Sequence, residues 1–130
     1  MNVLIAGASG SIGKNFILRC PRHWQILGLY HQNSDFLKFL ATEKLNHVTA
    51  CHCDLRNLSQ VQETFKNKKD VFDVCLFVLG NSDIGLSMRD PLKDVQDNLV
   101  TLINLITNTR IKKFIFTKVR IDKRDHHFGK

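Results

Sequence analysis

VLIAGASGSIG, residues 3–13, is the stretch that decides the fold. It opens with a compact apolar strand, and Ile12, Phe16 and Cys20 then recur every four residues as one face of a helix that Pro21 ends. The three glycines between strand and helix follow the spacing G-x-x-G-x-x-G. Glycines in such a loop permit positive φ, let a phosphate approach the backbone and let the helix pack tightly on the strand. The loop therefore predicts dinucleotide binding, with a merely tight strand-to-helix turn as the alternative.

Short apolar runs alternate with segments of helical period through the rest of the chain. We expect four further strands, at 25–30, 47–53, 71–79 and 113–117, and helices between them. Strands without polar alternation, separated by helices, are typical of a parallel sheet that is covered on both faces. Right-handed crossovers leave few topologies. The sequence thus predicts an α/β fold of the Rossmann type, a three-layer sandwich with five parallel strands in the order 3-2-1-4-5 and helices on both faces.

Three of the expected helices carry start signals. Ser34 is the expected cap of a helix at 35–41, and Ser59 with Gln62 fits a capping box. Pro91 suits the first turn of the last helix. That helix holds the clearest helical stripe in the chain, with apolar residues that step by three and four: Leu92, Val95, Leu99, Leu102 and Ile106.

The net charge of +7 is unevenly placed along the chain. From Arg110 onward there are eight lysines and arginines but two aspartates, so the rest is nearly neutral. Nucleic-acid binding would therefore depend on the tail, residues 118–130, alone. One aromatic residue, Phe128, supplies a poor stacking platform there. We expect a mobile basic tail rather than a nucleic-acid interface.

Nothing in the sequence predicts a membrane-spanning or exported protein. No apolar run reaches the ~18 residues that a span needs, and the amino-terminal residues form a strand pattern rather than a signal peptide. The four cysteines contain no C-x-x-C pair, which indicates reduced core residues and a cytoplasmic location. We expect no metal at Cys51-His52-Cys53, because alternate residues of a strand point to opposite faces.

Four stretches, in order and at matching spacing, resemble the amino-terminal part of the NAD(P)-dependent epimerase/dehydratase family, the extended short-chain dehydrogenase/reductases. They are VLIAGASGSIG at 3–13, CDLRN at 53–57, DVCLFVLG at 73–80 and DPLKDVQDNLVTLINLI at 90–106. The resemblance covers residues 1 to about 117, which we expect to form the NAD(P)-binding domain. The parent reaction that it implies is transient oxidation of a nucleotide-sugar hydroxyl by hydride transfer.

The resemblance also implies a set of cofactor-binding residues. Asp54 would bond the adenine amino group and Leu55 its neighbouring edge, with an Asx turn as the alternative role of Asp54. Leu79 and Gly80 would lie beside the ribose on the nicotinamide side, and Asn98 would be the internal asparagine of the last helix. The pyrophosphate would be faced by the glycine loop, through Gly7, Ser9, Gly10, Ser11, Ile12 and Gly13.

The residues after the second strand bear on the choice between NAD and NADP. An NAD site usually has an acid at this point to bind the ribose hydroxyls, and Tyr30 stands in its place. The absence of a carboxylate removes a barrier to a 2′-phosphate, although no Arg or Lys follows. His31 could offer a hydrogen bond and a partial charge. The cofactor is therefore expected to be NAD or NADP, with NADP favoured.

The family's catalytic Tyr-x-x-x-Lys pair is absent, because the single tyrosine, Tyr30, has Ser34 four residues on. Beyond the fifth strand the chain reads Thr117-Lys118-Val119-Arg120 in place of the hydroxyl-rich run that the family has. We therefore expect a truncated member without catalytic activity of its own. The alternative is a non-catalytic module that senses NADP(H) or binds a protein. In either case the fifth strand, near 113–117, would be an open edge for self-association or for a partner chain.

Overall fold

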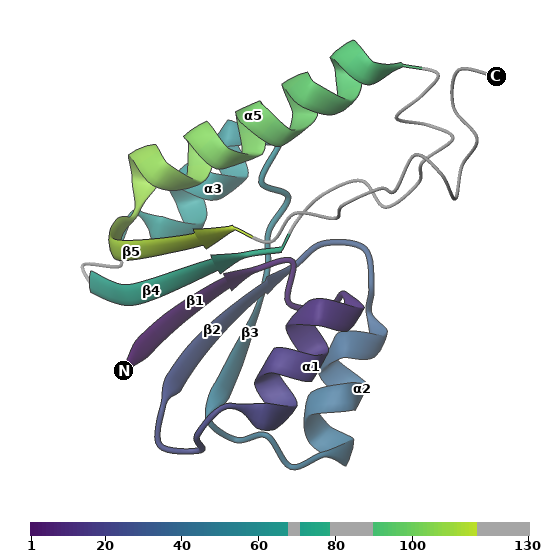
Figure 1. Cartoon of the computed structure of the whole chain (residues 1–130), viewed down its shortest axis with the longest axis vertical. Coiled ribbons are helices and arrows are strands. Elements are labelled where there is room, and N and C mark those ends of the chain that lie inside the picture. Colours follow the sequence, from purple (N-terminus) through teal and green to yellow (C-terminus); the bar gives the residue numbers. More distant parts are fainter. Residues whose placement is uncertain (68–70, 79–89, 117–130) are drawn as a thin grey trace, which may run out of the picture.

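The computed structural model describes residues 1–67, 71–78 and 90–116, and these form one five-stranded sheet with helices on both sides (Figure 1). The strands are β1 (Asn2–Ala6), β2 (Gln25–Tyr30), β3 (Val48–His52), β4 (Val71–Phe77) and β5 (Arg110–Phe116). The helices are α1 (Ser11–Arg19), α2 (Asp35–Thr42), α3 (Leu58–Phe65) and α5 (Pro91–Asn108). Among these residues no helix combines the length and hydropathy that crossing a membrane requires.

The strands lie in the order β3-β2-β1-β4-β5 and every neighbouring pair is parallel. The predicted topology is therefore confirmed. β1 lies in the middle of the sheet, with Leu4 opposite Leu27 on one side and Cys75 on the other. Its residues from Val3 to Ala6 are buried, as a central parallel strand requires.

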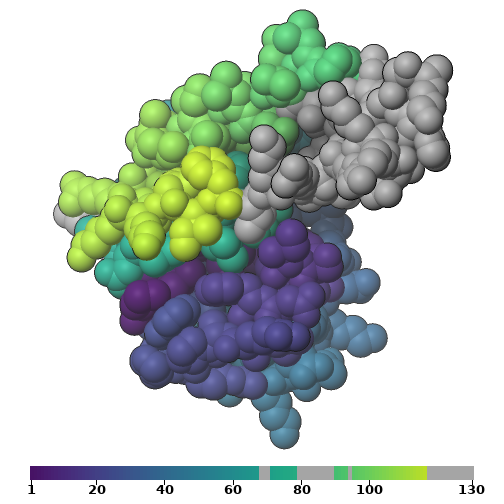
Figure 2. Space-filling view, in the orientation of Figure 1, coloured from purple at the N-terminus to yellow at the C-terminus, as the bar shows by residue number. Residues whose placement is uncertain are grey.

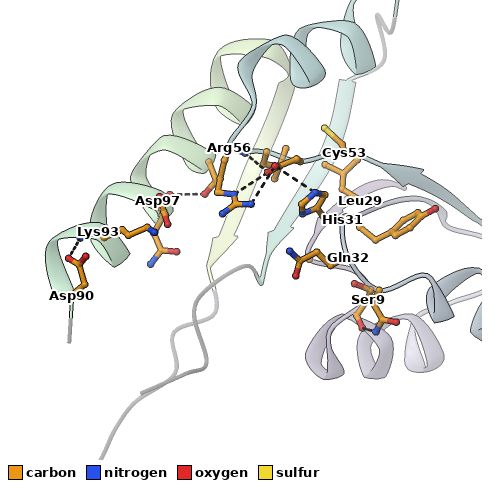
Figure 3. Close-up of a pocket in the computed structure, with 16 residues that line it drawn as sticks. Ser9, Leu29, His31, Gln32, Cys53, Arg56, Asp90, Lys93 and Asp97 are labelled. Atoms are coloured by element: carbon orange, nitrogen blue, oxygen red, sulfur yellow. Dashed lines mark hydrogen bonds and ion pairs between the residues drawn. The ribbon is translucent and has the colours of Figure 1, made fainter. Parts of the chain in front are cut away.

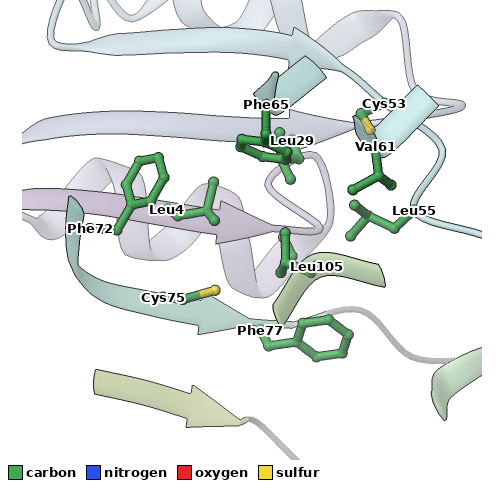
Figure 4. Close-up of a cluster of buried hydrophobic side chains, with 11 residues drawn as sticks. Leu4, Leu29, Cys53, Leu55, Val61, Phe65, Phe72, Cys75, Phe77 and Leu105 are labelled. Carbon is green, nitrogen blue, oxygen red and sulfur yellow. The ribbon is translucent and has the colours of Figure 1, made fainter. Parts of the chain in front are cut away.

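Each face of the sheet carries its own apolar core. Helices α1 and α2 cover one face and α3 and α5 cover the other (Figure 1). On the α3 and α5 side, Leu4 and Cys75 from the sheet pack with Val61 of α3 and Leu105 of α5 (Figure 4). On the α1 and α2 side, Val3 and Ile5 pack with Ile17 and Phe36. The alternation of β1 side chains between the two cores confirms a three-layer sandwich.

The two expected serine caps have different outcomes. At α2, Ser34 does occupy the N-cap position, but its side chain makes no capping bond, and the Asn33 side chain accepts from the Asp35 N–H at 3.1 Å. At α3 the cap is Asn57, whose Oδ1 accepts from the Gln60 N–H at 3.2 Å, and not Ser59. In both helices an asparagine one or two residues before the expected serine accepts a hydrogen bond from an N–H group of the first turn.

The expected apolar faces of α1 and α5 also differ from the observed ones. In α1, Ile17 and Gly13 are fully buried, while Ile12 is 45% exposed. In α5 the apolar stripe predicts the helix correctly, but such a stripe ordinarily faces a core. Here most of the stripe points outward, and Leu102 alone among its residues packs against the core. The buried side of the helix carries Thr101, Asn104 and Leu105.

The strand boundaries follow the prediction except at β5. This strand begins at Arg110, three residues before the expected start, and pairs with β4 from Val71 opposite Arg110 to Phe77 opposite Phe116. β5 is an outer strand of the described sheet. The expected boundary between domain and tail, at 117, and the tail itself lie outside the described residues.

Candidate functional site

The glycine loop turns sharply where β1 ends and is tied to the end of β2. Gly7 has a φ of 90°, a left-handed conformation that glycine adopts without strain. Its N–H and that of Ala8 both donate to the carbonyl of Leu29, at 3.3 and 3.0 Å. The side-chain amide of Asn33 donates to the Ser9 carbonyl at 3.4 Å. The loop is thus held against the carboxyl end of β2.

Gly13 lets α1 lie directly on this loop. A Cβ added at Gly13 would come within 2.7 Å of the Gly7 carbonyl oxygen and 2.8 Å of the Ala8 backbone. Such distances are incompatible with any side chain, because the atoms met are backbone. Gly10 differs, since a Cβ there would meet one atom, the Gly7 oxygen, at an ordinary 3.5 Å. The third glycine therefore serves helix packing, while the second leaves open space beside the loop.

The amino end of α1 has the properties of an anion site. Gly10 occupies the capping position, no side chain caps the helix, and no acidic residue lies in the first turn. The free N–H groups of a first helical turn and the positive end of the helix dipole favour a negatively charged group. Ser11 and Ile12, both exposed, begin this helix.

A cavity of about 550 Å³ opens beside the loop at the carboxyl ends of β1, β2 and β3 (Figure 3). A volume of this size is in the range of small-molecule and cofactor sites. Six of the predicted site residues line it: Gly7, Ser9, His31, Asp54, Leu55 and Asn98. Four others, Gly10, Ser11, Ile12 and Gly13, lie in the adjoining turn and helix end but not in the wall. Leu79 and Gly80 lie outside the described residues.

A compact cluster of charges forms around Asp54, which lines the cavity. Figure 3 labels its two partners, His31 and Arg56. The Arg56 Nε lies 3.2 Å from Asp54 Oδ1, and the His31 Nε2 lies 3.6 Å from Oδ2. The Arg56 N–H also donates to Oδ1 at 3.0 Å, which is an Asx turn. The alternative role of Asp54 is therefore present in the structure, while adenine contact stays a prediction.

This cluster keeps Asp54 ionised. Burial by itself raises the pKa of the Asp54 carboxyl, but the hydrogen bonds from Arg56 and the positive charges of Arg56 and His31 outweigh it and lower the pKa below its ordinary value. The pairing correspondingly raises the pKa of Arg56. Asp54 is thus a carboxylate at neutral pH, with both oxygens engaged by neighbours.

Helix α5 forms the far wall of the cavity, and of its lining residues the sequence pattern predicted Asn98 alone. Lys93, Asp97 and Thr101 line the cavity beside Asn98. The Asn104 side chain, which is buried, donates to the Leu55 carbonyl at 2.9 Å and so fixes α5 to the turn after β3. The sequence does contain a signal for this wall: the polar residues of α5 that line the cavity lie on the opposite side of the helix from its exposed apolar residues.

Tyr30 has a packing role. Its ring lies 5.5 Å from the rings of both Phe36 and His52, and the residue is half-buried. It lines the cavity at the end of β2, where the sequence places it in the position of the acid that NAD sites carry. The described residues offer no carboxylate at this position on β2.

The model of the "NAD dependent epimerase/dehydratase family" matches residues 3–118. The chain belongs to this family. The predicted resemblance is confirmed, and the family is one whose members bind NAD(P). The match includes the strand, glycine loop and helix of residues 3–13 together with the cavity wall on α5.

Three solved structures illustrate the likeness of this family member to known proteins. The UDP-Glc/GlcNAc 4-epimerase of Campylobacter jejuni is 27% identical with a TM-score of 0.68, over 88% of this chain and 36% of that one. The UDP-glucose 4-epimerase of Bifidobacterium longum, in complex with NAD+ and UDP, is 19% identical with a TM-score of 0.73, over 91% and 37%. Pen from Bacillus thuringiensis is 25% identical with a TM-score of 0.63, over 90% and 36%.

A reductase has the same architecture. The leucoanthocyanidin reductase of Vitis vinifera, in a binary complex with NADPH, is 17% identical with a TM-score of 0.61, over 96% of this chain and 38% of that one. At this identity the likeness concerns the fold. The chain thus spans somewhat over a third of the length of these relatives.

Proposed function

We propose that the cavity binds the adenosine half of a nicotinamide dinucleotide and that the glycine loop binds its pyrophosphate. The observation that carries the proposal is the position of the cavity. It lies at the carboxyl ends of the strands, with Gly7 and Ser9 in its wall and the uncapped end of α1 beside it. Ligands of open α/β sheets bind at this edge.

Each part of the site suits one part of such a ligand. The pyrophosphate would accept from the first N–H groups of α1, with Gly10 leaving room for its oxygens. The adenine would lie near Leu55 and Asp54, and the adenosine ribose near the end of β2 at His31. Leu79 and Gly80 would flank the nicotinamide ribose, and Asn98 would contribute from α5.

We propose a modest preference for NADP over NAD. The end of β2 carries Tyr30 and His31 and no carboxylate, so a 2′-phosphate meets no like charge there. Arg56 adds a cation to the cavity that the sequence pattern did not reveal. Its guanidinium is paired with Asp54, however, and this neutral pair adds less attraction than a free cation would.

We propose that the 130-residue chain binds the cofactor but does not transfer hydride. The family reaction needs a tyrosine as acid/base and a lysine that lowers its pKa, and this chain has one tyrosine, packed between two rings. The substrates proposed for the parent activity are nucleotide-sugars, as in the two named 4-epimerases. A role as a cytoplasmic NADP(H) sensor is the second candidate.

Partner binding along the outer edge of β5 is part of this second candidate. The strand is exposed at most positions, including Ile115 and Phe116. An outer strand offers backbone N–H and C=O groups to another chain. Arg110, Lys112 and Lys113 on this strand would favour an acidic partner segment over a second copy of the same strand.

Titration calorimetry with NADP+, NAD+ and ADP tests the binding site. We expect saturable binding of all three, tightest for NADP+. Gly10→Val should weaken binding at least tenfold without unfolding the chain, because a side chain there fits the fold but fills the phosphate space. Lys66→Ala, at the far end of α3, is the control and should bind as the parent does. Equal binding by Gly10→Val and the parent would contradict the proposal.

A further inference from the structure

His31 follows β2 directly and lines the cavity, with its side chain 37% exposed. Its Nε2 lies 3.6 Å from Asp54 Oδ2 in the turn after β3, an ion pair that Figure 3 marks with a dashed line. Its ring also lies 5.6 Å from the ring of His52 at the end of β3. His31 is thus held beside a carboxylate, open to solvent, at the place proposed for the adenosine ribose.

The cavity wall formed by the glycine loop and the end of β2 has no permanent positive charge among the described residues. The loop and residues 30–37 contain no lysine or arginine. Lys38 on α2 is exposed and does not line the cavity, while the Lys14 Nζ of α1 lies 5.3 Å from the centroid of the Phe39 ring. On this wall, as far as it is described, His31 is therefore the one side chain that can acquire a positive charge.

Two permanent cations line other parts of the cavity. The Arg56 guanidinium is already paired, with its Nε 3.2 Å from Asp54 Oδ1, and Lys93 belongs to α5. Figure 3 shows Lys93 at the opposite end of the cavity from His31. Figure 2 shows α5 in green along the top of the molecule and the first two helices in purple and blue at the bottom. A phosphate on the adenosine ribose would therefore lie nearer to His31 than to Lys93. Repulsion from Arg56, and from His52 when that ring is protonated, limits the charge on His31 in the free chain.

Acidic groups around the cavity favour the protonated form of His31. Although burial opposes it, the hydrogen bonds and positive charges of its neighbours keep the pKa of Asp54 low, so the nearest acid is a carboxylate at neutral pH. Asp35, in the first turn of α2, is exposed, and Asp90 and Asp97 line the far wall with α5. His31 is thus a group whose charge can respond to a bound phosphate.

We propose that protonated His31 recognises the 2′-phosphate of NADP, so that the choice between NADP and NAD depends on pH across the neutral range. This specificity rests on the proposed cofactor site and names the group that determines it. An imidazolium pairs with a phosphate dianion, whereas a neutral imidazole offers it a single uncharged hydrogen bond. NADP therefore binds with uptake of a proton whenever His31 is neutral in the free chain. NAD has no phosphate at this place and takes up none.

The direction of the pH dependence follows from linkage between proton and cofactor. The complex with NADP holds the proton more tightly than the free chain does, so the affinity for NADP falls as the pH rises through the neutral range. A phosphate monoester keeps most of its second charge above about pH 6, so the ligand itself retains the charge there. An exposed ion pair contributes modestly, and we expect NADP+ to bind about threefold more tightly at about pH 6.5 than at about pH 8.5.

Titration calorimetry of the full chain with NADP+ and NAD+ over this pH range tests the role of His31. In the parent, the ratio of the two affinities should rise about threefold on acidification. Proton uptake, measured in buffers of different ionisation enthalpy, should accompany NADP+ alone. His31→Gln keeps a hydrogen-bonding side chain without the charge and should lose both effects. His31→Arg, with a permanent charge, should prefer NADP+ at every pH. His23→Gln, at an exposed histidine before β2, is the control and should behave as the parent does.

Three outcomes would overturn the role of His31. An affinity ratio that does not change with pH, or proton uptake that persists in His31→Gln, does so while leaving the proposed cofactor site intact. Uptake that is lost in His52→Gln but kept in His31→Gln assigns the recognition to the other imidazole. Absence of binding by both dinucleotides, in a parent chain that thermal unfolding shows to be folded, overturns the cofactor site and the role of His31 together.

Discussion

Helices α1 and α5 cover opposite faces of the same sheet, yet they bury different kinds of surface. α1 packs against the sheet through Gly13 and Ile17. α5 packs through Thr101, Asn104 and Leu105 and leaves six apolar side chains exposed. Both sides leave some apolar surface uncovered, but α1 exposes two large apolar side chains, Ile12 and Leu18, whereas α5 exposes six. The cavity lies between the two, with the glycine loop on one wall and α5 on the other (Figure 3).

The largest expected change in the free energy of unfolding distinguishes the buried side of α5 from its exposed side. Leu105→Ala should lower the free energy of unfolding by about 3 kcal/mol, because it opens a cavity in a fully packed cluster. Leu99→Ala, the matched control, should change it by less than about 0.5 kcal/mol when the chain is monomeric. Urea unfolding at low protein concentration measures both. Equal losses would mean that the apolar stripe is part of the core, and the contrast between α1 and α5 would disappear.

The next effect concerns the tight contact of α1 with its loop. Alanine in a helix is favoured over glycine by about 1 kcal/mol, but at Gly13 its Cβ would meet backbone atoms closer than 3 Å. The clash should dominate, and Gly13→Ala should destabilise the chain by about 2 kcal/mol. Gly10→Ala, where space is open, is the comparison and should stay within about 0.5 kcal/mol. A stabilised Gly13→Ala variant would show that α1 is not held by close backbone approach.

A smaller loss of stability is expected when the hydrogen bond from Asn104 of α5 to the Leu55 carbonyl is removed. Asn104→Ala leaves the buried Leu55 carbonyl without its 2.9 Å donor, and should cost about 1.5 kcal/mol in the free energy of unfolding. Gln96→Ala on the exposed side of the same helix is the control, with no expected change. Unfolding by denaturant gives the comparison. If the two variants behave alike, the polar side of α5 does not hold the helix in place.

The smallest effect is a pH dependence from the cavity between the two helices. The folded pKa of Asp54 is below its ordinary 3.8, so its stabilising contribution is complete above pH 3.8 and is lost as the pH falls through the folded pKa. Asp54→Asn keeps an acceptor for the Arg56 N–H but removes the charge. Near pH 7 it should be less stable by about 0.5 kcal/mol, a value reduced by the exposure of Arg56. The difference should vanish in strong acid; a constant difference from pH 7 to pH 2 would refute the role of the charge.

The local sequence pattern was sufficient to predict the strands and helices, but not which face of each helix is buried. The spacing of apolar residues predicted each strand and helix, and right-handed crossovers gave the order 3-2-1-4-5. The cap of α3 was wrongly expected at Ser59, and Ser34 caps α2 without a side-chain bond, because asparagine, serine and threonine all cap helices and the geometry of the preceding turn decides which side chain bonds. In α5 the spacing of the apolar residues predicted a helix, but that spacing alone does not show whether those residues face the core of the same chain.

The site was predictable where neighbours in sequence are neighbours in space. The glycine loop is such a case, since strand, turn and helix follow one another directly. The cluster of His31, Asp54 and Arg56 was predicted only in part, because His31 follows β2 and lies 23 to 25 residues before the other two, which follow β3. The α5 wall was missed, apart from Asn98, because its polar residues become a cavity lining only when the helix packs beside the turn after β3.

The amino-acid sequence by itself determined the parallel sheet, its strand order, the glycine turn and the family, because all of these depend on local spacing and on the handedness of connections. Only the tertiary structure decided which side of α5 is buried, which residue caps α3, and how Arg56 pairs with Asp54 beside the glycine loop. These features depend on contacts between residues distant in sequence, whose free energies are set by burial and geometry rather than by the pattern of any one segment.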